Sequence, residues 1–165
     1  MALIKNDAAA APESWTTVDA ETVIPVEGDV LVPAARWVAE RESLRQRADR
    51  VGVLLQPADD ALTLTDALDG LALIAVAFPK FTDGRGYSSA RLLRDRLGYT
   101  GELRAVGDVL PDQVFYMRRV GFDAFDLAEG KSVETALAQL KTFSVTYQAA
   151  ADDERPLYRR IQRPA

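Results

Sequence analysis

Residues 78–96, FPKFTDGRGYSSARLLRDR, bring together residue types that can hold an oxyanion. The DG and RG dipeptides favour a tight turn, and Gly86 would also let a ligand approach the backbone closely. One of the two serines that follow can cap a helix, whose first N–H groups attract anions. The guanidinium of Arg85 suits a planar or tetrahedral oxyanion. We therefore predict an anion-binding set of Arg85, Gly86, Ser88 and Arg91.

The same residues also have a structural interpretation. The two glycines could simply make a tight turn, and a serine could be an ordinary helix cap. Arg91 and Asp95 are four residues apart, which favours a surface ion pair on a helix. The spacing leaves both interpretations open.

Three carboxylates, Asp83, Asp108 and Asp126, follow three successive predicted strands. Because ligands in parallel α/β folds bind at the carboxyl ends of the strands, these side chains could converge there on Mg²⁺. Asp83 and Asp108 are also the candidates for a catalytic base, should the chain be an enzyme, a point that the sequence leaves open. Aspartate is also common in turns and in the first turns of helices for structural reasons alone, so we do not predict a bound metal.

The composition excludes several classes of function. The chain has 165 residues, a formal net charge of −5, and neither Cys nor His. It therefore has no thiolate nucleophile, disulfide, Cys-ligated cluster, His-ligated haem or catalytic His. The acidic balance argues against nucleic acid or an anionic membrane as a partner. No apolar run is long enough to span a membrane, so we expect a cytoplasmic protein.

The elements that must position these residues are predicted strands and helices that alternate along the sequence. The run LALIAVAF at residues 71–78 is apolar throughout, as is typical of a parallel strand buried on both faces. We predict one α/β domain with about five parallel strands, in an open doubly wound sheet; a partial (β/α) barrel is the alternative, because a full barrel needs roughly 250 residues. The predicted strands cover residues 30–32, 50–56, 71–78, 101–109 and 122–127.

The two ends of the chain differ in pattern from the middle. Residues 1–20 are rich in alanine and predict a flexible or edge segment, with the α/β domain over 21–148. Residues 149–165 predict a polar, flexible tail. Its arginines alternate with apolar residues, which suits a segment that docks on a partner as well as a merely solvated tail.

Arg104 lies inside the fourth predicted strand, where a charged side chain needs a solvated face or an acidic partner. Asp123 and Asp126 on the next strand are the candidate partners. We favour such a structural ion pair over a catalytic role.

The stretch FPKFTDGRGYSSARLLRDRLGYTGELRAVGDVLPDQVFYMRRVGFDAFDL, together with GDVLVPAARWVAERESL and TFSVTYQ, resembles a bacterial family of unknown function. Members of this family are described as probable oxidoreductases involved in sulfite reduction. The resemblance covers nearly the whole chain and implies a role in sulfate assimilation, with sulfite reductase as partner.

The residues limit what that resemblance can mean. Sulfite reduction needs electrons from redox cofactors, but the chain has no Cys or His to ligate them and no dinucleotide-binding motif. We therefore expect no cofactor and an accessory role beside sulfite reductase. A homodimer is a further expectation, because a small parallel sheet exposes its edges. The alternative is a small oxyanion- or phosphate-binding enzyme or sensor. It would use residues 82–89, TDGRGYSS, which join a predicted strand to a predicted helix and which we call the TDGRGYSS corner.

Overall fold

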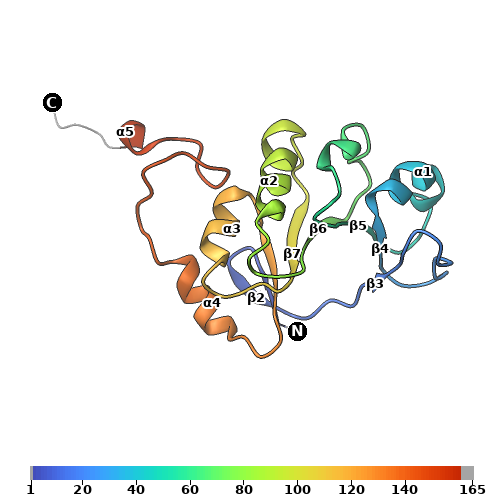
Figure 1. The fold of residues 1–165 in the computed structure, drawn as a ribbon, viewed down its shortest axis with the longest axis horizontal. Coiled ribbons are helices and arrows are strands. Elements are labelled where there is room, and N and C mark those ends of the chain that lie inside the picture. The colour runs from blue at the N-terminus through green and yellow to red at the C-terminus, as the bar shows by residue number, and fades with distance from the viewer. Residues whose placement is uncertain (1, 161–165) are drawn as a thin grey trace.

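One eight-stranded sheet organises the chain in a computed structural model, which describes residues 2–160 (Figure 1). The strands lie in the order β2-β1-β8-β7-β6-β5-β4-β3. Each of the five predicted strands overlaps one of them. Their bounds are β1 Ala2–Lys5, β2 Ala8–Ala10, β3 Thr16–Thr17, β4 Val30–Pro33, β5 Val51–Leu55, β6 Leu73–Phe78, β7 Glu102–Gly107 and β8 Ala124–Leu127.

The strands from β3 to β8 are parallel, and each lies beside the strand that precedes it in the sequence. Each new strand is added on the same side of the strand before it. Because the crossovers are right-handed, every connecting helix then lies on the same face of the sheet. A doubly wound sheet would instead need the strand order to reverse, so that helices cover both faces. The prediction of an open doubly wound sheet is therefore wrong: the sheet curls into a half-barrel, close to the alternative of a partial barrel.

Helices α1 to α4 pack on the outer, convex face of the half-barrel, and Figure 1 shows α1, α2 and α3 following one another along the sheet. Ser132 caps α4, as its position predicts, by accepting the Thr135 N–H at 3.1 Å. The helix that begins with α2 continues without a break into the π-helical turn η2. The bounds are α1 Ala34–Leu44, η1 Ala61–Leu64, α2 Arg85–Arg91, η2 Leu92–Arg96, α3 Val114–Val120, α4 Val133–Leu140 and α5 Leu157–Arg160.

Strand residues alternate between the two faces of the sheet. In β6, Ile74, Val76 and Phe78 belong to the large core under the helices, whereas Leu73 and Ala75 face the inner, concave side. No helix within residues 2–160 covers Leu73 and Ala75; the indole of Trp15, from the N-terminal segment, packs against their small cluster. The fold thus has one helix-covered face and one inner face that is partly covered by residues near its own N-terminus.

The two ends of the chain are ordered over most of their length. The flexible segment predicted for residues 1–20 contains three strands in the structure, since β1 and β2 extend the sheet beyond β8 and β3 pairs with β4. Of the tail predicted for 149–165, Ala151 and Asp152 contact Arg119 of α3, α5 follows with no buried residue, and residues 161–165 lie outside the described part. Among the helices between residues 2 and 160, none is long and apolar enough to cross a membrane.

Candidate functional site

The TDGRGYSS corner is a turn closed by its own ion pair. Asp83 accepts from the Arg85 backbone N–H at 3.2 Å and lies 2.7 Å from the Arg85 guanidinium. The hydrogen bond from that guanidinium, with the backbone N–H, lowers the pKa of Asp83 to about 2. The Arg85 side chain is 63% exposed, so it is accessible, but an oxyanion there would compete with Asp83 for it.

Gly86 is explained by packing. A Cβ at this position would lie 2.6 Å from Phe78 Cζ, a distance that side chains do not tolerate. The missing side chain lets α2 lie close to the end of β6. The predicted close approach of backbone and ligand is not needed to account for this glycine.

The helix begins earlier than a serine cap requires. It starts at Arg85 with Gly84 as its first flanking residue, and no side chain caps it. Ser88 therefore lies inside α2, exposed, and does not cap it. Arg91 forms the predicted surface pair with Asp95 one turn later, which is the structural interpretation of that residue.

The corners after β6 and β7 are hydrogen-bonded to each other. The Asp108 carboxylate accepts from the Phe81 N–H at 2.9 Å, and the Gln113 amide donates to the Phe81 carbonyl at 2.9 Å. This holds the loop before α2 against the start of α3. Among residues 2–160 no three acidic side chains are placed to hold a metal ion, so Asp83, Asp108 and Asp126 are not brought together as a ligand group.

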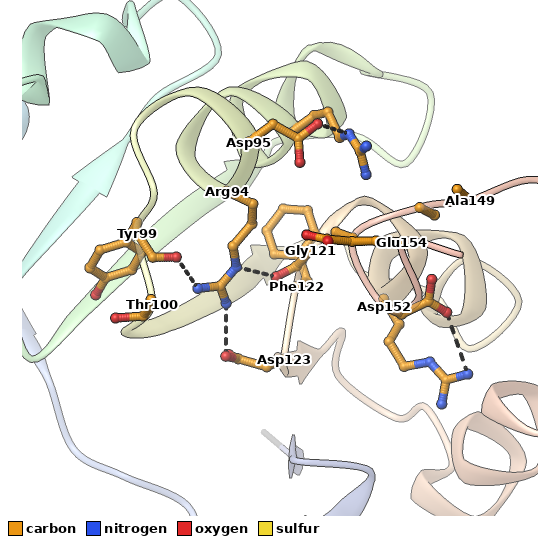
Figure 2. A pocket seen from close by; sticks show the side chains of 14 residues that line it. Arg94, Asp95, Tyr99, Thr100, Gly121, Phe122, Asp123, Ala149, Asp152 and Glu154 are labelled. Carbon is orange, nitrogen blue, oxygen red and sulfur yellow. Dashed lines mark hydrogen bonds and ion pairs between the residues drawn. The ribbon is translucent and has the colours of Figure 1, made fainter. Parts of the chain in front are cut away.

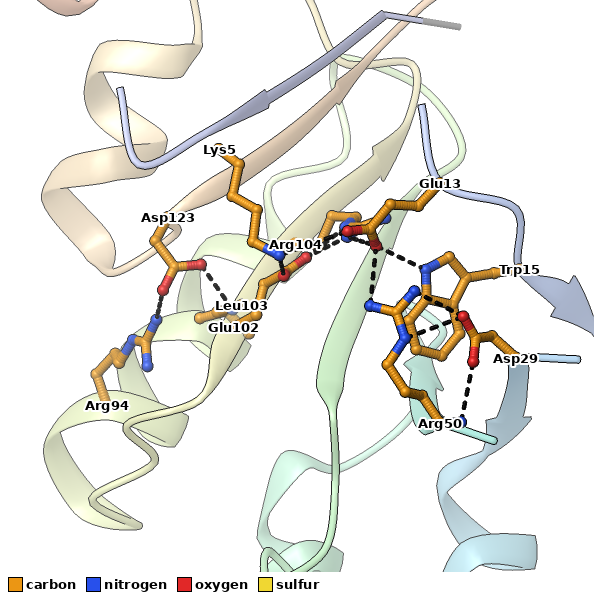
Figure 3. Close-up of polar contacts among 10 residues, drawn as sticks. All are labelled: Lys5, Glu13, Trp15, Asp29, Arg50, Arg94, Glu102, Leu103, Arg104 and Asp123. Atoms are coloured by element: carbon orange, nitrogen blue, oxygen red, sulfur yellow. Dashed lines mark hydrogen bonds and ion pairs between the residues drawn. The ribbon is translucent and has the colours of Figure 1, made fainter. Parts of the chain in front are cut away.

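Arg104 is the one buried charged residue among residues 2–160, and it lies on the inner face in an ion network (Figure 3). Its guanidinium donates to Glu102 at 2.6 Å and to Glu13 at 2.7 Å. The predicted partners, Asp123 and Asp126, are not the ones used. Asp123 pairs instead with Arg94 and accepts the Leu103 N–H, so its carboxylate is already occupied.

Glu13 connects this network to the N-terminal segment. It also accepts from the Trp15 indole N–H at 3.0 Å and lies within ion-pair distance of Lys5 and Arg50. Burial alone would raise the pKa of Glu13, but the hydrogen bonds from Trp15 and Arg104 lower it to about 2. The network therefore fastens residues 13–15 to the middle of the sheet.

Asp126 shares the inner face but makes no ion pair with any residue between 2 and 160. Burial raises the pKa of its carboxyl, and the charge of Arg104 offsets part of that effect. Its position near the carboxyl end of β8 is where parallel folds usually bind ligands.

Two hollows lie between α2, α3 and the C-terminal segment, and Figure 2 shows the one lined by Arg94 and Asp123. One has a volume of about 800 Å³, and the other about 420 Å³. Of the predicted anion-binding set, Ser88 and Arg91 line the smaller hollow, whereas Arg85 and Gly86 line neither. The predicted set is therefore not gathered in one cavity.

Arg94 forms one wall of the larger hollow and is fully engaged (Figure 2). It donates to the carbonyls of Gly121, Tyr99 and Gly101 at 2.7–2.8 Å and pairs with Asp123 at 2.8 Å. These bonds tie the end of η2 to the starts of β7 and β8. Arg94 therefore has a structural role and leaves little capacity for a ligand.

Two arginines at the end of α3, Arg118 and Arg119, make long-range contacts that the sequence did not indicate. Arg119 donates to Asp152 at 2.8 Å, and Arg118 pairs with Asp7 at 2.9 Å. The acidic run at residues 152–154 could have indicated the contact between Arg119 and Asp152, because its charge is opposite to that of the two adjacent arginines.

Together, fold and site define an α/β half-barrel protein with two hollows on the helical side, beside the C-terminal segment. The chain belongs to the family described as "Bacterial protein of unknown function (DUF934)", whose model matches residues 52–158, from the second residue of β5 into α5. No curated protein and no solved structure matches the chain.

Proposed function

We propose that this chain is an accessory protein of assimilatory sulfite reduction, which docks on sulfite reductase and carries no redox cofactor of its own. The resemblance of almost the whole sequence to a family linked with sulfite reduction supports the partner. The absence of Cys and His supports the accessory role, because the usual ligands for an iron–sulfur cluster or haem are lacking.

The observation that carries the docking proposal is a run of exposed apolar side chains near the C-terminus. Phe143, Val145, Tyr147 and Tyr158 are 60%, 58%, 76% and 69% exposed. We call residues 143–158 the aromatic segment. Single exposed apolar residues are ordinary, but several on one short segment are typical of a protein-binding surface, where aromatic anchors are enriched.

The test is co-elution of the full-length chain with its host's cofactor-loaded sulfite reductase from a sizing column. We expect the wild-type protein to co-elute, and the double variant Val145→Ser/Tyr147→Ser to elute separately. The matched control is Val23→Ser/Val26→Ser, which removes two side chains that are 87% and 91% exposed on a distant loop. The proposal is supported if the control co-elutes with the reductase and Val145→Ser/Tyr147→Ser does not. Separate elution of the wild type and the reductase contradicts it.

A second candidate is an oxyanion- or phosphate-binding enzyme or sensor at the TDGRGYSS corner. The exposed Arg85 side chain favours it, since among residues 2–160 only Asp83 pairs with that arginine. Sulfite, sulfate, phosphate and nucleotides should be compared by thermal shift. Binding at a hundred times Kd adds about 2.7 kcal/mol of stability. An anion shift that disappears in Arg85→Ala supports this site, and a shift that persists excludes it.

A further inference from the structure

The groove between α2 and α3 is covered by an extended piece of the chain, residues 146–154, which we call the strap. Both hollows described above border it, and both are lined by Ala149 and Ala150 together with Arg91 of α2. The strap therefore lies in the groove with unfilled volume beside its small side chains (Figure 2).

Polar contacts hold the strap, and most of them go to one residue. The Ala151 N–H donates to the Arg119 carbonyl at 3.0 Å. The Arg119 guanidinium donates to the Asp152 carboxylate at 2.8 Å, to the Gln148 carbonyl at 2.5 Å and to the Thr146 hydroxyl at 3.2 Å. These are the contacts that a basic groove makes with an acidic peptide.

The strap can leave this groove at low cost. None of the residues from 141 to 160 is buried, so detachment exposes little apolar surface. Segments with few buried contacts open locally without unfolding the domain. What is lost is mainly the hydrogen bonding of Arg119, which a partner carboxylate could replace.

An emptied groove would free Arg119 for such a replacement, because Asp152 of the strap is its paired carboxylate. The other arginines along the groove, Arg91, Arg94 and Arg118, keep carboxylate partners outside the strap. The Arg119 side chain is only 11% exposed beneath the strap, and the Arg118 Nε is buried without a hydrogen-bond partner. Both lie at the C-terminal end of α3, where the helix dipole adds negative potential and favours their charge. Removing Asp152 would leave Arg119 without its paired carboxylate.

We propose that the groove between α2 and α3 binds an acidic peptide segment of a partner protein, and that the strap is an internal stand-in that this segment displaces. Asp152 marks where the partner's carboxylate binds Arg119. The hollows beside Ala149 and Ala150 leave room for larger side chains. Tyr87 and Tyr116 line the smaller one, which suits an apolar or aromatic side chain. This goes beyond docking through the exposed side chains of the aromatic segment, because it assigns the groove beneath the strap, which is itself part of that segment, as a second binding surface.

The test measures binding of a labelled synthetic peptide, SVTYQAAADDERP (residues 144–156), to the full-length chain by fluorescence anisotropy. In the wild type the strap competes at an effective concentration in the millimolar range, so we expect weak binding. Asp152→Asn in the full-length chain loosens the strap and should tighten peptide binding by about tenfold. The same peptide with Ala150→Leu should bind more tightly, and the peptide with Asp152→Asn more weakly.

Two controls keep the result interpretable. Arg119→Gln, added to the Asp152→Asn chain, should abolish binding while thermal melting shows that the domain is folded. Hydrogen exchange of the wild type should show the Ala151 amide exchanging faster than the amides of α3. Equal peptide binding by wild type and Asp152→Asn, or binding that does not need Arg119, would overturn the proposal. No reductase is present, so failure here leaves the docking proposal of the previous section untouched.

Discussion

At position 86 the chain needs a residue without a side chain, because an added Cβ would meet the Phe78 ring at 2.6–3.1 Å. Gly86→Ala should force α2 away from β6 and lower the free energy of unfolding by about 1–3 kcal/mol. The matched control is Gly84→Ala, where the nearest atom lies 3.9 Å away and φ is −83°. Chemical denaturation of the two variants measures the difference; equal stabilities would mean that the contact with Phe78 does not explain the glycine.

Asp126 is a residue whose ionisation works against folding. Because burial raises its pKa in the folded state, ionising it at pH 7 costs folding free energy, and the folded protein takes up the proton first as the pH falls. Asp126→Asn should therefore raise Tm at pH 7, by about 2 °C, and the gain should vanish near pH 3, where the aspartate is protonated in both states.

The control for this prediction is Glu129→Gln, an exposed carboxyl in the loop after β8. It should leave Tm unchanged at both pH values. A lower Tm for Asp126→Asn at pH 7 would show that the carboxylate has a stabilising partner. A higher Tm for Asp126→Asn at pH 7 would make Asp126 a candidate ligand-binding residue, because functional residues are often retained at a cost to stability.

Ion pairs of Glu13 fasten the N-terminal segment to the sheet. Glu13 has a pKa of about 2 in the folded state against 4.5 as its ordinary value, so its ionised form stabilises the fold. That contribution is complete above pH 4.5 and is lost as the pH falls toward 2. Glu13→Gln should lower stability at pH 7 by about 1–3 kcal/mol, and its stability should fall less steeply than that of the wild type between pH 4.5 and 2.

Urea unfolding at several pH values would measure this, with Glu21→Gln as the control because Glu21 is exposed nearby. The segment should also lose protection from hydrogen exchange over residues 13–17 in Glu13→Gln, because Arg104 and Trp15 lose their shared acceptor. Parallel pH profiles for the variant and the wild type would mean that Glu13 does not fasten this element.

Across the whole molecule, local patterns predicted the elements but not their arrangement. The apolar run of β6 and the Ser132 cap are local signals, and both correspond to the structure. The order of strands depends on the direction of each crossover, which apolar periodicity does not record, so a doubly wound sheet was expected where a half-barrel exists. One of the two partners of Arg104, Glu13, is 91 positions away, beyond the reach of strand spacing.

The candidate site was predictable to a similar extent. The turn and the ion pair of Arg91 follow from short-range rules. The placement of Asp108 near the preceding corner follows from the shared edge of neighbouring parallel strands. The cavity under the strap does not, because it requires the C-terminal segment to return to α3 through contacts of Arg119. For long-range polar contacts of this kind, the sequence shows only that residues of opposite charge are present, and not which of them pair.

The measurement that tests the central claim most directly is hydrogen exchange on the full-length chain with and without cofactor-loaded sulfite reductase. We predict slower exchange in the presence of the reductase across residues 141–158, where the exposed apolar side chains lie, with the amides of β5 and β6 unchanged. Unchanged exchange across residues 141–158 at concentrations of reductase well above those of the chain would contradict the account.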